Sequence, residues 1–418
     1  MCIRDSLRYE GSSKFYSDRW GLFPGISAGW RISSEKFMRN VRAVDDLKLR
    51  VSYGTTGNQG FNTNTAYRMY SKDSWTYYNG QWMTVYGLMH NQNRDMKWEI
   101  KKEFDVGLDF SLFNRRLNGR MDYFSRKIED AIYSGIPVAS PPAVYATSTV
   151  NIGDITNKGF EFELNGRVVD TKDWTFDTSL VGSFVGKSRL EGMAKDTHME
   201  FQAMPHGGGS AVRIFGGQEI GRYFLYRFAG VREEDGTPMI YSKDNKVIPY
   251  ASGTDEDRVQ TGNGLPKAVL SWNNTVRYRN WDLNLFFRSW LGQDVYNVTD
   301  MIQGVNCKIT EGQNLLRTAY RRNKAITNTD RLMLLDYWLE KGDFLKLDAV
   351  TLGYTLPRNK IKYVEKLRCY FTVRNVCTLT GYSGLDPEVN VNGLAPGFEG
   401  MSQYPRTRSF ILGIEIGF

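Results

Sequence analysis

The sequence predicts an all-β chain that forms part of a transmembrane antiparallel β-barrel. Three observations lead to this prediction: apolar and polar residues alternate in many runs, several runs reach about ten residues, and the connections between runs are alternately short and long. A strand places successive side chains on opposite faces, so alternation gives it one apolar surface. In a barrel that spans a membrane, this surface faces lipid and the other face looks into a polar lumen.

The last run of the chain shows the alternation most clearly. Its apolar face is formed by every second residue, namely Phe410, Leu412, Ile414, Ile416 and Phe418. The intervening positions are polar or glycine, and only Ile411 departs from the pattern. We expect the terminal Phe418 to act as the signal for barrel assembly.

The same alternation recurs at residues 104–112, 159–168, 174–180, 281–288 and 367–374. Runs of this length cross a bilayer when tilted, whereas strands of a soluble β-sandwich average about five or six residues. The charged side chains on the polar faces are therefore expected to face the lumen. They are Asp105, Asp109, Arg120, Asp122, Glu161, Glu163 and Arg167.

The connections fall into two classes. Residues 113–117, 169–174, 279–281 and 357–366 are short, and residues 55–97, 128–157, 187–222, 292–343 and 380–404 are long. Bacterial outer-membrane barrels have short periplasmic turns and long outer loops. The alternation predicts about fourteen strands if residues 7–10 form the first strand and residues 222–242 form a hairpin of two strands.

Two tryptophans follow short turns directly. Trp174 and Trp281 stand where an aromatic girdle at the membrane interface is expected. The alternative is that both are ordinary buried tryptophans.

A third group of aromatic residues lies in the long segment 55–97 and consists of Trp75, Tyr77, Tyr78 and Trp82. Exposed aromatic rings stack on sugars and pack on peptides, so these four are candidate substrate contacts. The alternative is that they pack the loop against its neighbours.

Composition argues against other functions. The net charge is +8, but Lys and Arg are mixed with 46 acidic residues along the chain, so no nucleic-acid-binding stripe is predicted. The three histidines have no metal-ligand spacing, and no nucleophile elbow is present. We therefore expect neither an enzyme nor a cofactor. Asp255, Glu256 and Asp257 could hold Ca²⁺, although a solvated loop is the simpler interpretation.

The four cysteines predict no disulfide framework. Cys369 and Cys377 share one predicted strand, eight residues apart, which is too far for a bridge. The other two are Cys2 and Cys307.

Six stretches follow one another in the order found in a known family. They are RWGLFPGISAGWRIS at 19–33, DLKLRVSYGTTGNQ at 46–59, DYFSRKIED at 122–130, TLGYTLP at 351–357, YSGLDPE at 382–388 and YPRTRSF at 404–410. Together they resemble the SusC/RagA family of TonB-dependent outer-membrane transporters. Because these motifs mark strands and turns, they transfer the fold and not a substrate site.

The resemblance implies an architecture larger than this chain. Relatives have a plug domain before a barrel of about 22 strands. Residues 7–418 would then be the C-terminal portion of the barrel, with the plug and the TonB-contacting segment missing, and residues 1–6 are expected to be a foreign scar. The lumen charges would line a hydrated pore or contact the plug.

The resemblance also implies a function. We expect nutrient import across the outer membrane, with energy relayed by TonB–ExbB–ExbD through the missing N-terminal region. Relatives import glycans or peptides, and the loop aromatics Trp75, Tyr77, Tyr78 and Trp82 favour glycans rather than peptides here. The expected partners are a SusD/RagB-like lipoprotein that lids the outer mouth and the surrounding lipid. A passive porin or adhesin barrel and a secreted all-β enzyme or binding module are the alternatives.

Overall fold

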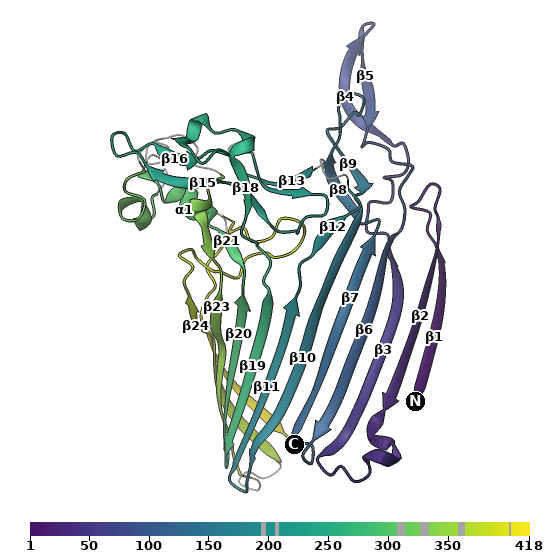
Figure 1. Ribbon diagram of the computed structural model, residues 1–418, viewed down its shortest axis with the longest axis vertical. Helices are drawn as coiled ribbons and strands as arrows, with labels where there is room; N and C mark the ends of the chain where they lie inside the picture. The colour runs from purple at the N-terminus through teal and green to yellow at the C-terminus, as the bar shows by residue number, and fades with distance from the viewer. Residues whose placement is uncertain (194–197, 205–208, 307–313, 327–333, 358–363, 401–402) are drawn as a thin grey trace.

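The computed structural model describes residues 1–193, 198–204, 209–306, 314–326, 334–357, 364–400 and 403–418. A 13-stranded antiparallel sheet dominates them, and Figure 1 shows its long strands side by side as one curved wall. Within the described residues its path holds twelve strands in chain order: β1 (Cys2–Gly11), β2 (Trp20–Arg31), β3 (Val44–Asn58), β6 (Glu99–Leu112), β7 (Leu117–Glu129), β10 (Asp154–Asp170), β11 (Trp174–Val185), β19 (Ala268–Tyr278), β20 (Trp281–Leu291), β23 (Phe344–Thr355), β24 (Lys366–Thr380) and β25 (Ser409–Gly417). The short β12 (Arg189–Glu191) pairs with β10 off this path.

The register of the wall places apolar residues beside apolar residues. Along β25, Phe410 and Leu412 lie opposite Val373 and Phe371 of β24. Large apolar side chains on this face are exposed over the whole width of the wall, among them Phe104, Tyr123, Phe160, Phe184, Trp272, Leu352, Phe371 and Leu412. The path strands contain between 9 and 17 residues, enough to cross a bilayer. An uncovered apolar face of this size is typical of a lipid-facing barrel and not of a soluble sandwich.

The expected count of fourteen strands is wrong for the described chain, because the hairpin at residues 222–242 is not part of the wall. Its strands are β15 (Tyr223–Val231) and β16 (Pro238–Tyr241). Tyr223, Phe224 and Leu225 are all buried, so β15 has apolar packing on both faces and no alternation. With four residues, β16 is also too short to cross a membrane. A hairpin contributes two strands, so its removal from the wall leaves each remaining strand running in the expected direction. The short and long connections of the wall therefore still alternate.

β15 and β16 belong instead to a six-stranded sheet above the wall. Its other members are β13 (His198–Ala203), β14 (Ser210–Phe215), β17 (Val247–Pro249) and β18 (Arg258–Thr261). Near it lie the pair β21 (Asp294–Tyr296) and β22 (Leu339–Lys341) and the helix α1 (Val298–Gln303). We call these elements, together with residues 381–400, the outer subdomain.

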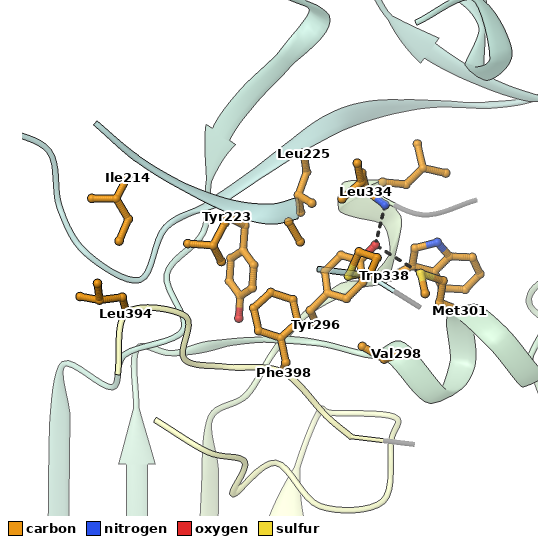
Figure 2. Packing of buried hydrophobic residues seen from close by; sticks show 14 of the residues in the cluster. Ile214, Tyr223, Leu225, Tyr296, Val298, Met301, Leu334, Trp338, Leu394 and Phe398 are labelled. Atoms are coloured by element: carbon orange, nitrogen blue, oxygen red, sulfur yellow. Dashed lines mark hydrogen bonds between the residues drawn. The ribbon is translucent and has the colours of Figure 1, made fainter. Parts of the chain in front are cut away.

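The outer subdomain has its own apolar core, which Figure 2 shows from close by. Tyr223, Tyr296, Trp338 and Phe398 pack together in it; Tyr296 and Trp338 share the segment 292–343, and the other two come from two further outer loops. The Tyr223 hydroxyl lies 2.9 Å and 2.8 Å from the carbonyl oxygens of Asp294 and Gly397. The core therefore joins three loops that are far apart in the sequence.

Two further hairpins complete the outer side. β4 (Tyr70–Tyr78) and β5 (Gln81–Leu88) form a hairpin that projects away from the wall, and β8 (Ile132–Pro137) pairs with β9 (Thr147–Asn151) beneath it. In the part of the chain that the structure describes, the short 3₁₀ helices are η1 (Ile32–Ser34), η2 (Lys36–Met38), η4 (Tyr250–Ser252), η5 (Asp255–Asp257), η7 (Arg317–Tyr320) and η8 (Asp336–Trp338). Across the described ranges, no helix is both long and apolar enough to span a membrane.

The first strand is longer than expected. β1 begins at Cys2, and residues 2–6 pair in register with residues 25–29 of β2. The expected scar at residues 1–6 therefore lies mostly within a paired strand, and its foreign origin stays a prediction.

Candidate functional site: the polar wall and the outer loops

The polar face of the wall carries a cluster of charged residues around Arg50 of β3. The Arg50 guanidinium donates hydrogen bonds to Asp109 at 2.8 Å and to Asp122 at 2.7 Å. The register places Gly107 between Arg50 and Asp122. A Cβ at Gly107 would stand 2.2 Å from the Asp122 carboxylate and 2.5 Å from the guanidinium. The absence of a side chain at Gly107 therefore lets Arg50 of β3 reach Asp122 of β7 across the intervening strand β6.

The other predicted lumen residues share this face. Arg120 forms an ion pair with Glu163 at 3.1 Å, and Arg167 donates a hydrogen bond to Asp177 at 2.9 Å. A cavity of about 480 Å³ in this region is lined by charged residues that include Arg50, Asp105, Arg120, Asp122 and Glu161. The structure thus gathers the seven predicted residues on one face and adds Arg50 and Asp177. The alternation of Leu47, Leu49 and Val51 with Lys48, Arg50 and Ser52 was the signal that could have identified Arg50.

The two predicted girdle tryptophans belong to one row of aromatic residues on the apolar face. Trp174 packs on Tyr278 with ring centroids 4.4 Å apart, and Trp281 packs on Tyr354 at 4.7 Å. Tyr278 and Trp281 are also register partners, so the row crosses four strands. Both tryptophans are 49% exposed, which contradicts the alternative that they are buried. Their place at the membrane interface stays a prediction.

The four aromatic residues of segment 55–97 all lie on the projecting β4–β5 hairpin. Trp75, Tyr77, Tyr78 and Trp82 are 56–70% exposed, so the alternative of packing against neighbouring loops is not what the structure shows. Tyr77 and Trp82 are cross-strand partners with ring centroids 5.4 Å apart. The Lys72 ammonium lies 4.0 Å from the centre of the Trp75 ring. Strand alternation places Trp75 on the face of Tyr77 and Trp82, and Tyr78 on the opposite face.

A buried ionic cluster fastens the last outer loop to the wall. The Lys346 ammonium of β23 donates to Asp386 at 2.7 Å and to Glu388 at 2.9 Å. Arg288 of β20 donates to Glu388 at 2.9 Å, and Arg406 lies 2.9 Å from Asp386. Burial raises the pKa of Glu388, but hydrogen bonds from Arg288 and Lys346 outweigh it and hold this pKa below the ordinary 4.5. We call these five residues the loop anchor.

The acidic run that could have held Ca²⁺ is engaged by protein groups. Asp255 accepts hydrogen bonds from Arg213 and Arg258, and Lys243 donates to Glu256. Asp257 accepts from the backbone N–H groups of Thr254 and Lys243. A cation would have to displace these donors. Among the residues that the structure places, no group of three or more His, Cys, Asp or Glu is arranged to hold a metal.

The remaining residues singled out in the sequence have simple positions. Cys369 and Cys377 both lie on β24 and, like Cys2, are free, whereas Cys307 lies outside the described residues. Phe418 follows β25 directly and is exposed. Its role as an assembly signal stays a prediction.

Comparison with known proteins identifies the family. The family model described as "TonB dependent receptor-like, beta-barrel" matches residues 5–376. TonB-dependent receptor SusC of Bacteroides thetaiotaomicron is 28% identical over 99% of this chain and 42% of its own length. TonB-dependent receptor P3 of Formosa agariphila is 27% identical over 99% of this chain and 43% of its own.

A solved structure of the RagAB peptide transporter has the same fold, with a TM-score of 0.82 and 21% identity over 100% of this chain and 46% of that chain. The chain spans less than half the length of the curated relatives it matches. The uncovered apolar face of the wall, its charged opposite face and these matches agree with one another. The chain therefore belongs to the TonB-dependent receptors, a family of outer-membrane β-barrel transport proteins and not of enzymes.

Proposed function

We propose that the complete protein imports oligosaccharides across the outer membrane, using energy that TonB–ExbB–ExbD delivers through a region outside this chain. A SusD/RagB-like lipoprotein would cover the outer mouth. The observation that supports import most directly is the division of one wall into an exposed apolar face and a charged face. The relatives named TonB-dependent receptors support the energy source.

The residues of the wall have separate roles in this proposal. Asp105, Asp109, Asp122, Glu161 and Glu163 would face the lumen together with Arg50, Arg120 and Arg167, and would contact water or a plug domain. Because several of these charges already form ion pairs with one another, a neutral cargo would pass without having to supply counter-charges.

The outer aromatics favour an oligosaccharide as cargo. Trp75, Tyr77 and Trp82 offer flat, exposed rings on one side of a hairpin that projects away from the wall. Sugar rings stack on such faces through their C–H groups. A peptide is the second candidate, because the RagAB structure of the same fold is named a peptide transporter.

Uptake by intact cells tests the proposal. The full-length gene would be restored to a strain that lacks it, and accumulation of fluorescent neutral oligosaccharides and of fluorescent oligopeptides would be measured. We expect oligosaccharide uptake that stops when tonB is deleted. Uptake that persists without TonB would indicate a passive porin, and TonB-dependent uptake of peptides alone would refute the assignment of cargo.

A further inference from the structure

A small cavity lies on the outer side, at the base of the β4–β5 hairpin. Its volume is about 220 Å³, and its walls come from two segments, residues 59–98 and residues 130–153. The first segment contributes Thr65, Met89, His90 and Asn91, and the second contributes Gly135, Tyr145, Thr147, Ser148 and Thr149. We call this cavity the threonine pocket. It shares no residue with the charged cavity of the wall that Arg50, Asp105 and Arg120 line.

The pocket is built on a rigid frame. The Asn91 amide nitrogen donates to the carbonyl oxygens of Tyr145 at 2.6 Å and Thr147 at 2.9 Å. Its amide oxygen accepts from the backbone N–H groups of Val144 and Tyr145. Asn93 donates to the Thr149 carbonyl oxygen at 2.9 Å. Two asparagines thus bind the two segments together, and the pocket exists before any ligand arrives.

The lining selects a neutral ligand. It presents several hydroxyl groups and no Asp, Glu, Lys or Arg, and the Nε2 atom of its one histidine, His90, is engaged by the backbone carbonyl oxygens of Asn64 and Tyr67. A charged group placed there would lose water without gaining an opposite charge, which is costly. A hydroxyl donates one hydrogen bond and accepts two, so threonine and serine side chains can exchange hydrogen bonds with the hydroxyls of a sugar. Tyr145, which is 42% exposed, adds an aromatic ring to the rim.

The size of the pocket fits a single sugar. Its volume equals that of about seven water molecules at about 30 Å³ each, and it is below the range of about 300–1,000 Å³ that is usual for larger ligands. At Gly135 the backbone φ is +83°, and a Cβ there would meet nothing within 4 Å. Gly135 is an exposed residue of the lining, so a longer chain can continue past it into solvent.

We propose that the threonine pocket binds one neutral pyranose unit of an oligosaccharide at the outer surface, before import. This inference deepens the proposed function and rests on it, because it assumes a glycan cargo. Thr147 and Ser148 supply hydroxyl contacts and Tyr145 supplies an apolar surface. The rest of the glycan extends out of the pocket past Gly135.

Equilibrium binding to the full-length protein in detergent tests the pocket. The probes are hexasaccharides of glucose, mannose and xylose, with a neutral hexapeptide as comparison. The double variant Thr147→Val with Ser148→Ala removes two hydroxyls and keeps the side chains similar in size. We expect it to weaken the best-bound sugar about tenfold, as removal of two hydrogen-bonding groups should.

Two further variants distinguish a loss of ligand contacts from a loss of folding. Met89→Trp fills the pocket from the opposite segment and should also weaken binding. Thr76→Val removes a hydroxyl on the nearby hairpin, outside the pocket lining, and should leave binding unchanged. Unchanged affinity in both pocket variants, or equal losses in the Thr76 control, would overturn the inference.

TonB-dependent uptake of the same probes by cells separates the two proposals. If wild-type cells import a sugar and the pocket variants bind it as tightly as the wild type, the pocket inference fails while the proposed function stands. If the wild-type protein binds and imports only the peptide, the proposed cargo fails and the pocket inference fails with it.

Discussion

Substitution of Lys346 in the loop anchor should release the last outer loop without unfolding the barrel wall. The Lys346 side chain is 2% exposed and contacts both Asp386 and Glu388. Removing one partner of a buried ion pair costs about 3–5 kcal/mol, because the other charge stays buried. Arg288 and Arg406 still neutralise the two acids in Lys346→Met, so we take the lower figure of about 3 kcal/mol.

This cost predicts a measurable change in local opening. At about 1.4 kcal/mol for each factor of ten, amide hydrogens of residues 381–400 should exchange about a hundredfold faster in Lys346→Met. The assay is hydrogen exchange with mass spectrometry on the full-length protein in detergent. Strands β20 and β23 should keep their protection, because their backbone hydrogen bonds are unchanged.

A matched variant makes the test specific. Lys366→Met removes a lysine that contacts Glu415 at the same 2.7 Å, but both side chains are 50% exposed. An exposed pair contributes little, so this variant should leave exchange of residues 381–400 unchanged. Equal exchange in Lys346→Met and the wild type would refute the claim that the buried pair holds the loop.

Three further predictions concern other parts of the structure. Gly107→Ala should lower the thermal midpoint in detergent, because its Cβ would stand 2.2 Å from the Asp122 carboxylate, whereas Gly54→Ala, which has open space, should not. Acid should loosen the loop anchor. The pKa of Glu388 is depressed in the folded state, so the stability that its ion pairs contribute is fully present above the ordinary pKa of 4.5 and is lost as the pH falls through the lower folded-state pKa. Hydrogen exchange of residues 381–400 should therefore become faster at that acidic pH and stay constant near neutrality. Trp174→Ala should reduce the fraction that assembles into lipid vesicles, and normal assembly would argue against a girdle.

The wall could be predicted from sequence because its signal is local. In the run 104–112 the even-numbered residues lie on one face of the strand and the odd-numbered residues on the other, so the sequence alone assigns each residue to a face. Short turns then place neighbouring runs side by side, where they pair. The ion pairs between Arg50 and Asp109 or Asp122 could not be predicted, because they require the register between three strands. The alternation fixes which face a side chain occupies and leaves its partner open.

The outer subdomain could not be predicted for a different reason. Its core joins Tyr223, Tyr296, Trp338 and Phe398, which are separated by up to 175 positions and follow no common period. From the sequence, residues 222–242 are expected to form a hairpin of the barrel because that hairpin keeps the short and long connections alternating. Both faces of β15 are buried by residues distant in the sequence, and this burial shows that β15 is not a membrane-spanning strand.

Tertiary contacts also explain two polar residues on the apolar face of the wall. Thr178 and Asn274 are register partners on the side that carries Trp272. A polar group that faces lipid must be satisfied within the protein. The Trp272 indole N–H donates to the Thr178 hydroxyl at 2.9 Å, the hydroxyl donates to the Asn274 amide oxygen at 2.9 Å, and Asn274 is only 6% exposed. The departure from alternation at Thr178 is therefore compensated by its neighbours, so strict alternation at every position is not required for a strand to face lipid.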